Sequence, residues 1–392
     1  MIPRETYINK LLEYKDKQLI KIITGVRRAG KSTLFELYQE KLNVPKKQIQ
    51  NINLEDPVFA DLSDWKKLYD YINKKIVPNK QNYIFIDEVQ NIKDFQKAVD
   101  GLFIKKNVDL YLTGSNSRMQ SGEWATLLSG RYIEIHIFPL SFKEYYSCFN
   151  TLNKEEAFVK YLENSSFPYT VQLNNKKQTD EYLSGIYNTI VLKDIIENKK
   201  IRDVGHLDKI IRFMADNIGN ITSVKKISDT ISSDGFKILP MTVQSYLQAL
   251  VDSYILYKTQ RYDIKGKKLL QTLDKYYLVD IGLRYNLLGN RKVDLGRILE
   301  NIVYLELLRR GYKVYIGKFN DKEIDFIAEN YEGIKYYQVA QTVRDENTLS
   351  RELFPLNSIK DHYPKFLLTR DIDPKISHNG ITQLNVVDWL LE

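Results

Sequence analysis

The stretch that decides the fold is "GVRRAGKST", from Gly25 to Thr33. It lies between the apolar run "LIKIIT" and the segment "LFELYQEKL", whose pattern predicts a helix. The spacing G-x-x-x-x-G-K-[ST] between a strand and a helix is typical of a phosphate-binding loop. Free backbone N–H groups and the positive end of the helix dipole would point at one spot there, which favours phosphate. The alternative interpretation is a glycine-rich turn that binds nothing.

The residues of this loop have different expected roles. Gly25 and Gly30 can take positive φ and let the backbone approach phosphate oxygens closely. Lys31 would reach the β- and γ-phosphates, and the hydroxyl of Ser32 would be a ligand of Mg²⁺. The whole stretch is expected to contact the nucleotide: Gly25, Val26, Arg27, Arg28, Ala29, Gly30, Lys31, Ser32 and Thr33.

A second apolar run, "NYIFIDEVQN" at residues 82–91, ends in two acids, Asp87 and Glu88. If this strand lies beside the first one, its carboxyl end delivers both acids to the phosphate site. Asp87 would then hold Mg²⁺, directly or through water, and Glu88 would orient and deprotonate the water that attacks the γ-phosphate. The alternative is that the two acids cap the next helix.

Two further runs supply candidate catalytic side chains. "VDLYLTGSNSRM" places Thr113, Ser115 and Asn116 after a strand, where Thr113 or Asn116 could touch the γ-phosphate or the attacking water. Such residues are also ordinary turn formers. "RYIEIHIF" begins with Arg131, which could neutralise transition-state charge in its own subunit or in a neighbour, or lie at the surface of a strand edge.

Composition limits the remaining possibilities. The 392 residues exceed what one hydrophobic core usually serves, so two or three domains are expected. No uninterrupted apolar stretch of about 18 residues is present, and the start has no signal-peptide core, so we expect a cytoplasmic protein without a membrane partner. The single cysteine, Cys148, excludes an internal disulfide and a cysteine-type zinc site. The net charge of +8 mildly favours an anionic partner such as nucleic acid.

The motifs together resemble a known family. The segments "IKIITGVRRAGKSTLFEL", "YIFIDEVQ", "LYLTGSNS" and "GRYIEIHIFPLSFKEYY" are similar to the AAA-type ATPases that are widespread in bacteria and archaea, and the similarity covers essentially the whole chain. The resemblance implies an α/β fold: a P-loop NTPase core with a parallel sheet, a helical lid, a winged-helix domain and a C-terminal α/β restriction-endonuclease-like domain. It also implies ATP rather than GTP, and the chain has no N-K-x-D guanine signature.

The pattern of helices and strands, read with this resemblance, predicts four segments. They are the P-loop AAA-type ATPase domain at 1–148, the helical lid or linker at 149–205, the winged helix at 206–281, and the nuclease-like domain at 282–392.

The predicted winged helix is a candidate for binding DNA. Three helical patterns are followed by two strands around the basic turn "RYDIKGKK". The presumed recognition helix has no lysine or arginine and offers only Gln244 and Gln248 to read bases, so the alternative is a winged helix used for packing or for protein contact. The residues of the turn that could contact phosphate are Arg261, Lys265, Lys267 and Lys268.

The last segment resembles a restriction-endonuclease core, in which a helix Glu, a strand Asp and an acid-x-Lys set hold Mg²⁺ and activate water. Glu300 matches the helix acid and Asp325 matches the strand acid. At the third element, Gln338 replaces the acid and Ala340 replaces the lysine. Two acids and an amide bind a hard dication weakly, so the sequence predicts a vestigial site. Lys322 or Lys335 could supply the missing cation only by reaching the site from elsewhere.

The sequence therefore favours an ATP-binding, Mg²⁺-dependent ATPase that acts as a nucleotide-driven switch. DNA, a protein partner and a second copy of the chain are all open as partners. The first alternative is a nucleotide-gated module that binds DNA or protein and hydrolyses ATP negligibly. The second is an ATP-dependent nuclease. The residues predicted to carry ATP hydrolysis are Lys31, Glu88, Thr113, Asn116 and Arg131, with Ser32 and Asp87 on the metal.

Overall fold

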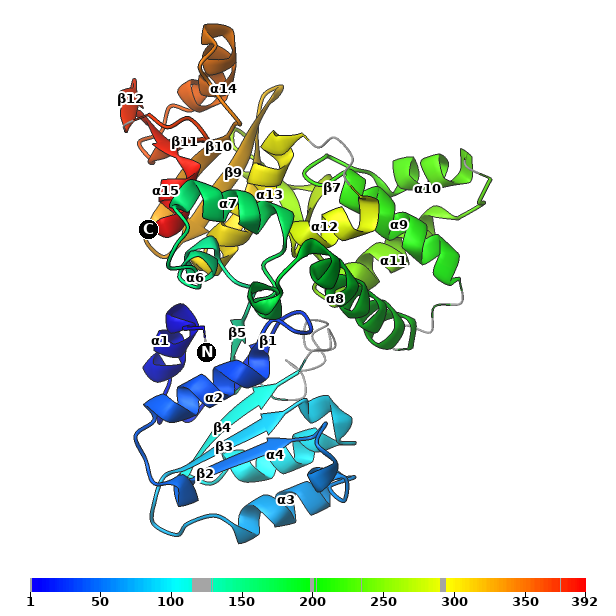
Figure 1. Cartoon of the computed structure of the whole chain (residues 1–392), viewed down its shortest axis with the longest axis vertical. Helices are drawn as coiled ribbons and strands as arrows, with labels where there is room; N and C mark the ends of the chain where they lie inside the picture. The colour runs from blue at the N-terminus through cyan, green and yellow to red at the C-terminus, as the bar shows by residue number, and fades with distance from the viewer. Residues whose placement is uncertain are drawn as a thin grey trace. The chain divides into compact units, whose positions relative to one another are not determined.

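The fold is described by a computed structural model, which covers residues 2–114, 128, 130–197, 201, 203–233, 235–289, 294–373 and 375–392. The chain forms two compact units (Figure 1). The first comprises Met1–Pro139 with Asp252–Tyr254, and the second comprises Leu140–Val251 with Ile255–Glu392.

The first unit contains a five-stranded parallel sheet in the order β2-β3-β4-β1-β5. Every residue of β1, β3 and β4 is buried, as expected for a parallel sheet that is covered on both faces. The expected parallel α/β core is thereby confirmed. Its elements are α1 (Glu5–Glu13), β1 (Ile20–Thr24), α2 (Lys31–Lys41), β2 (Ile49–Asn53), α3 (Trp65–Lys74), β3 (Asn82–Asp87), α4 (Phe95–Phe103), β4 (Val108–Thr113) and β5 (Tyr132–His136).

The order of the strands corrects one expectation. The strand that carries the two acids, β3, does not lie beside β1, because β4 pairs with both of them. In the register, Ile22 faces Leu112 on one side of β4, and Phe85 faces Tyr111 on the other. Buried parallel strands are uniformly apolar, so their sequences do not reveal which are neighbours. The acids still arrive at the carboxyl edge, because all five strands run in the same direction.

Helices cover both faces of this sheet. Residues of α3 and α4, such as Leu68 and Leu102, pack with Ile22, Ile84 and Leu110 in one apolar cluster. On the other face lies α2, where the Phe35 ring meets the Phe85 ring edge-on with centroids 5.0 Å apart, and the Tyr38 and Tyr111 rings lie 5.2 Å apart. The helix that follows the glycine-rich loop is therefore anchored directly on the strands that end at the site.

A buried polar network also lies on the α2 face. The ammonium of Lys21 in β1 donates to Oδ1 of Asp109 in β4 at 2.5 Å, and neither side chain is exposed by more than 1%. The other carboxylate oxygen accepts from the Tyr111 hydroxyl at 2.8 Å and from the Asp16 backbone N–H at 2.9 Å. The Tyr38 hydroxyl lies 2.9 Å from that of Tyr111. Burial lowers the pKa of Lys21 and raises the pKa of Asp109.

The second unit begins with helices. The pair α6 and α7 each start with a capping box, in which Ser141 and Asn153 accept from the backbone N–H three residues on. The helices of this unit are α6 (Phe142–Tyr146), α7 (Lys154–Glu163), α8 (Lys176–Thr189), which continues as a π-helix (Ile190–Glu197), α9 (Val204–Asp216), α10 (Val224–Ser233), α11 (Pro240–Asp252), α12 (Ile281–Leu288), α13 (Leu295–Arg309), α14 (Glu346–Ser358) and α15 (Val386–Leu391).

An eight-stranded sheet forms the rest of the second unit, in the order β12-β13-β11-β10-β9-β8-β6-β7. The hairpin β6–β7 is not free-standing, because residues 261–263 of β6 pair in parallel with residues 316–318 of β8. The sheet therefore crosses the predicted boundary between residues 281 and 282. Its strands are β6 (Leu256–Asp263), β7 (Lys268–Leu278), β8 (Lys313–Phe319), β9 (Lys322–Asn330), β10 (Gly333–Val339), β11 (Lys365–Thr369), β12 (Ile376–His378) and β13 (Ile381–Asn385).

Candidate nucleotide-binding site

The glycine-rich loop joins β1 to α2 and uses both of its glycines. Gly25 has φ +142°, and a Cβ placed there would lie 2.3 Å from the Ile137 carbonyl oxygen, so no larger residue fits. Gly30 has φ +97° and is the N-cap of α2, which leaves the first N–H groups of the helix directed into the loop. Arg28 also has positive φ, +65°. The loop is therefore shaped to approach an anion with its backbone.

Lys31 is held over this loop. Its ammonium donates to the carbonyl oxygens of Gly25 at 3.1 Å and of Val26 at 3.4 Å, and the residue is only 5% exposed. Backbone carbonyls hold the charge weakly compared with a phosphate, which would form charge-assisted hydrogen bonds with the same ammonium. A cation and the start of a helix thus converge on one place.

Asp87 and Thr113 meet at the carboxyl ends of β3 and β4. The Thr113 hydroxyl donates to Oδ1 of Asp87, and the Ser32 side chain also hydrogen-bonds this carboxylate. Burial raises the pKa of Asp87, while the hydrogen bonds from Ser32 and Thr113 oppose that shift. The structure therefore brings together the two predicted metal ligands, from α2 and β3.

Glu88 follows directly in a strained conformation. Its φ of +56° lies in the left-handed region, which is uncommon for a glutamate and costs free energy that the surrounding structure must supply. Its backbone N–H donates to the Thr113 hydroxyl at 2.9 Å, and its side-chain Oε2 accepts from the Gln90 amide. Only 8% of the residue is exposed. The Thr113 hydroxyl oxygen thus hydrogen-bonds both acids, as donor to the Asp87 side chain and as acceptor from the Glu88 backbone.

The remaining predicted loop residues differ in exposure. Val26 and Ala29 are buried, Ser32 and Thr33 are exposed at the start of α2, and the Arg27 guanidinium lies 3.5 Å from the Glu55 carboxylate. Asn116 and its neighbour Ser115 lie outside the described residues.

Arg131 is not brought to the site within its own chain. It precedes Tyr132, which pairs with Ile20 at the amino edge of the sheet, whereas the loop follows Thr24 at the carboxyl edge. Arg131 lies five residues before His136, which is about 16 Å along β5. This is farther than an arginine side chain spans. A role at the phosphate therefore requires that Arg131 come from a neighbouring chain.

Behind the loop, β5 adds two residues that the sequence did not single out. The Thr24 hydroxyl donates to the Glu134 carboxylate at 2.6 Å and lies 3.0 Å from Nδ1 of His136. Burial, followed by the charge of Lys31, lowers the pKa of His136 to about 3, so this ring is neutral. Thr24, the last residue of β1 before the loop, is thus held by two side chains of the neighbouring strand.

Arg4 is a further residue that sequence reasoning missed. Its guanidinium donates from Nη1 to the Ala29 carbonyl oxygen at 3.0 Å and from Nη2 to the Phe138 carbonyl oxygen at 2.6 Å. The residue is 4% exposed, and the guanidinium lies 4.8 Å from the centroid of the Tyr7 ring. An arginine that precedes an amphipathic helix gives no hint of this contact, because its partners are 25 and 134 residues away.

The predicted vestigial nuclease residues form a separate cluster in the second unit. The Lys275 ammonium, from β7, donates to Oε1 of Glu300 at 2.9 Å and lies 2.6 Å from Oε1 of Glu323. The Tyr277 hydroxyl donates to the same Glu300 oxygen at 2.6 Å. Burial alone would lower the pKa of Lys275, but the nearby carboxylates raise it above its ordinary value. Burial and then the charge of Glu300 raise the pKa of Asp325 well above its ordinary value.

Gln338 uses its amide within the protein. Its oxygen accepts from the Asp325 backbone N–H at 3.3 Å, and its nitrogen donates to the Glu352 carboxylate at 3.0 Å. Across the described parts of the chain, no three histidine, cysteine, aspartate or glutamate side chains are grouped so as to hold a metal ion. The cation among these acids is the side chain of Lys275.

The two lysines considered from sequence as substitutes lie elsewhere. Lys335 donates to the Tyr312 hydroxyl at 2.7 Å, and the Lys322 ammonium lies 5.4 Å from the centroid of the Phe354 ring. Lys275 was overlooked because it comes from the hairpin β6–β7, which the sequence assigned to a different domain.

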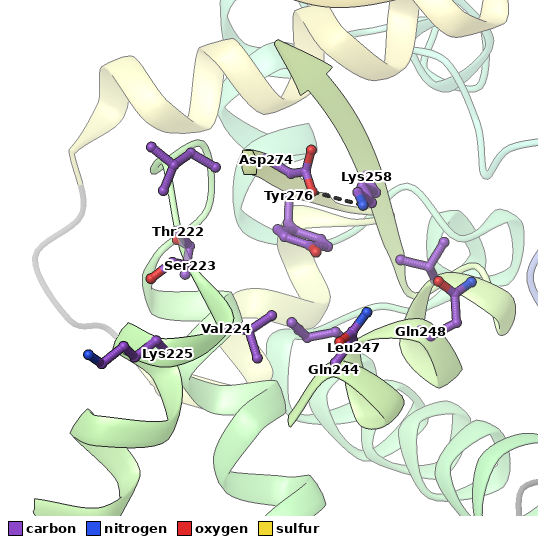
Figure 2. Close-up of a pocket in the computed structure, with 12 residues that line it drawn as sticks. Thr222, Ser223, Val224, Lys225, Gln244, Leu247, Gln248, Lys258, Asp274 and Tyr276 are labelled. Atoms are coloured by element: carbon purple, nitrogen blue, oxygen red, sulfur yellow. Dashed lines mark ion pairs between the residues drawn. The ribbon is translucent and has the colours of Figure 1, made fainter. Parts of the chain in front are cut away.

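The predicted nucleic-acid residues lie on α11 and on the same hairpin. Gln244 and Gln248 line a cavity of about 380 Å³ between α10, α11 and the hairpin (Figure 2). On the strand side of this cavity, Lys258 and Asp274 form an ion pair at 2.8 Å, beside Tyr276 (Figure 2). At the hairpin, Arg261 is half-buried, and the exposed cations at its tip are Lys265, Lys267 and Lys268.

Comparisons with known proteins identify the domain that contains this loop. An AAA-domain family model matches residues 17–146, and a model of a domain of unknown function, DUF8612, matches residues 155–294. An uncharacterized protein of Haemophilus influenzae is 39% identical over 100% of this chain and 99% of its own length. An uncharacterized protein of Methanocaldococcus jannaschii is 29% identical over 90% of this chain and 82% of its own.

Among solved structures, a Walker-type ATPase of Pyrococcus abyssi superposes on 73% of this chain and 96% of its own, with a TM-score of 0.52 and 17% identity. At this identity the likeness shows a shared fold. Among the described residues, none of the helices combines the length and apolar character needed to cross a membrane.

Proposed function

The chain belongs to a family of proteins with an AAA domain, and from its loop and acid pair we propose that it is a Mg²⁺-dependent ATPase acting as a nucleotide-driven switch. The observation that carries the proposal is the convergence of Lys31, Ser32, Asp87 and Glu88 at the carboxyl ends of β1 and β3. A structural turn would have no need for a buried lysine and two buried acids at one sheet edge.

The donor set fits a magnesium ion. Mg²⁺ prefers oxygen ligands and is usually held by one or two protein groups together with phosphate oxygens and water. Ser32 and Asp87 offer a hydroxyl and a carboxylate that already contact each other. When bound with ATP, the ion would neutralise charge on the β- and γ-phosphates. Asp87 stays oriented for this task because Thr113 donates a hydrogen bond to it.

We assign the proton transfer to Glu88. Its carboxylate takes a proton from the water that attacks the γ-phosphate, and ADP and phosphate leave. Its backbone is fixed by Thr113, so the two acids are held as a pair. Lys31 exchanges its loop carbonyls for phosphate oxygens when ATP binds. Thr113 acts in this scheme as the brace that relates the metal ligand to the base.

The test is ATP binding and phosphate release with matched variants. Glu88→Gln should bind ATP normally and lose turnover by about a hundredfold or more, because only the proton acceptor is removed. Lys31→Ala should lose binding and turnover together. Glu40→Gln, an exposed residue of α2, is the matched control and should behave as wild type. Turnover that survives in Glu88→Gln would reject Glu88 as the base, and a wild type that binds ATP without turnover would favour the gated binding module.

We further propose that the second unit carries a winged helix, formed by α9, α10, α11 and the hairpin β6–β7, that contacts DNA. The support is the exposed basic tip, where three lysines could meet phosphates. Turnover should rise when duplex or single-stranded DNA is added at a fixed salt concentration. Replacing the tip lysines with alanine should make DNA affinity less sensitive to salt. The negative slope of log affinity against log salt should become less steep by about 0.9 for each duplex phosphate that a lysine no longer neutralises. ATPase activity that ignores DNA would instead favour a protein partner.

We propose that the nuclease-like cluster does not cut DNA, because the amide of Gln338 stands where an acid would bind Mg²⁺, and the Lys275 ammonium already pairs with Glu300 and Glu323. Incubating the protein with plasmid, ATP and Mg²⁺ or Mn²⁺ should leave the DNA intact. Cutting that disappears in Asp325→Ala would overturn this assignment.

A further inference from the structure

Arg4 connects two walls of the nucleotide site. Its guanidinium reaches the carbonyl oxygen of Ala29, inside the loop, and that of Phe138, just after β5. The bond to Phe138 is short and the bond to Ala29 has ordinary length, and the donor of both is a charge that is almost entirely buried. The ring of Tyr7, one turn along, lies against the same guanidinium in a cation–π contact.

The bond to Ala29 determines where the loop's next donor points. A peptide unit is planar and trans, so its C=O and N–H point in opposite directions. Because the Ala29 carbonyl points toward Arg4, the N–H of Gly30 points away from it. Gly30 is the N-cap of α2, where free N–H groups gather. Arg4 therefore orients one donor of the anion site without facing that site itself.

The bond to Phe138 holds the opposite wall. The Phe138 backbone N–H donates to the Tyr7 hydroxyl at 3.2 Å. Arg4 and Tyr7 therefore bond both the carbonyl and the N–H of Phe138. The preceding residue, Ile137, presents the carbonyl oxygen that a Cβ on Gly25 would meet at 2.3 Å. The start of the loop at Gly25 and its end at Ala29 are thus both fixed against one short segment.

We propose that Arg4 is a positioning residue of the nucleotide site, which holds the loop in its anion-binding conformation before nucleotide arrives. The inference rests on the proposed ATPase function. An oriented backbone N–H contacts the phosphate equally in the ground state and the transition state, so its loss raises KM and the dissociation constant and leaves kcat largely unchanged.

The experiment compares Arg4→Met, which keeps the stem and removes all donors, with Arg4→Lys, which can bond only one carbonyl at a time. Lys10→Met, an exposed residue of α1, is the control. Amide hydrogen exchange of the nucleotide-free full chain is measured for the loop, 25–33, and for β3, alongside ATP affinity and steady-state kinetics. Arg4→Met should speed loop exchange, leave β3 unchanged, and weaken ATP binding about ten- to hundredfold, the effect of one charge-assisted hydrogen bond. Arg4→Lys should fall between Arg4→Met and wild type.

The outcomes separate the two claims. Loop exchange equal to wild type in Arg4→Met overturns the positioning role, and so does faster exchange spread equally over the loop and β3, which would mean general destabilisation. A fall in kcat with unchanged KM also overturns it. If the wild type itself binds no ATP, the proposed function fails, while loop exchange in the nucleotide-free protein still decides whether Arg4 holds the loop.

Discussion

Replacing Lys21 with methionine should destabilise the first unit by about 3–5 kcal/mol, the usual cost of leaving one partner of a buried ion pair alone. The substitution keeps an unbranched chain and removes the ammonium that bonds Asp109 at 2.5 Å. The carboxylate would retain only two neutral donors, the Tyr111 hydroxyl and the Asp16 backbone N–H. Water cannot replace the lost cation, because the Asp109 side chain is 1% exposed.

The size of this loss should depend on pH. Without the ammonium, the folded-state pKa of Asp109 rises further above its unfolded value of about 3.9. The folded variant then binds its proton more tightly than the unfolded chain does, so its stability falls as pH rises from the unfolded pKa toward the folded pKa. The difference between Lys21→Met and wild type should therefore be larger at pH about 8 than at pH about 5.

Native-state hydrogen exchange measures this effect where it arises. Exchange of the β1 and β4 amides gives the free energy of opening of the first unit, and exchange of β9 and β10 serves as an internal control in the second. Adding Asp109→Asn to Lys21→Met should restore much of the loss, because the amide oxygen still accepts from Tyr111 and carries no charge. A loss under about 1 kcal/mol in Lys21→Met, or a double variant no better than the single one, would refute the ion-pair reasoning.

Three other changes have definite expected results. Gly25→Ala should abolish ATP binding measured by equilibrium titration while the chain stays folded, because its Cβ would lie 2.3 Å from the Ile137 carbonyl oxygen; normal affinity would contradict this. His136→Gln should make the free energy of unfolding less dependent on acid pH. In wild type the folded pKa of His136, about 3, lies below the unfolded value of about 6.5, so the free energy of unfolding falls by about 2 kcal/mol between pH 6.5 and pH 5. Denaturant unfolding of the variant at these two pH values should not show that fall. Lys275→Met should lower the melting temperature of the second unit by leaving Glu300 buried without its cation, and an unchanged thermal transition would show that the pair contributes nothing.

Local chemistry was predictable from the sequence, whereas contacts between distant segments were not. The spacing of Gly25, Gly30 and Lys31 within one short segment predicts a loop that opens a helix, and both glycines have the positive φ that such a loop requires. Lys21 and Asp109 are single charges in two otherwise apolar strands, but no local pattern pairs them, because they lie 88 residues apart. The strand order was not predictable, because buried parallel strands share one composition.

Arg4 and Lys275 were missed for a different reason. Each acts through partners that no local pattern links to it. Arg4 donates to backbone carbonyl oxygens, and Lys275 in β7 contacts Glu300 in α13 and Glu323 in β9, a strand that is not adjacent to the hairpin. Backbone carbonyls are present at every residue, so no sequence motif marks the ones that an arginine will select. Whether Arg131 can reach the phosphate site of its own chain depends on the end of β5 at which it lies. Only the register of β5 with β1 shows that this is the amino end, away from the loop.

The pairing of β6 with β8 affects how this chain can be divided, in the laboratory or by recombination. A fragment that stops at residue 281 would lack β8, so the edge of β6 that pairs with β8 would be open. It would also leave Lys275 without Glu300 and Glu323. An unpaired strand edge invites association with other chains, and an isolated buried ammonium disfavours folding. A recombinant of two related sequences joined at residue 281 would combine a hairpin from one protein with the remaining strands of the sheet from another. The segment from the hairpin to the C-terminus should therefore be inherited, expressed and crystallised as a single piece.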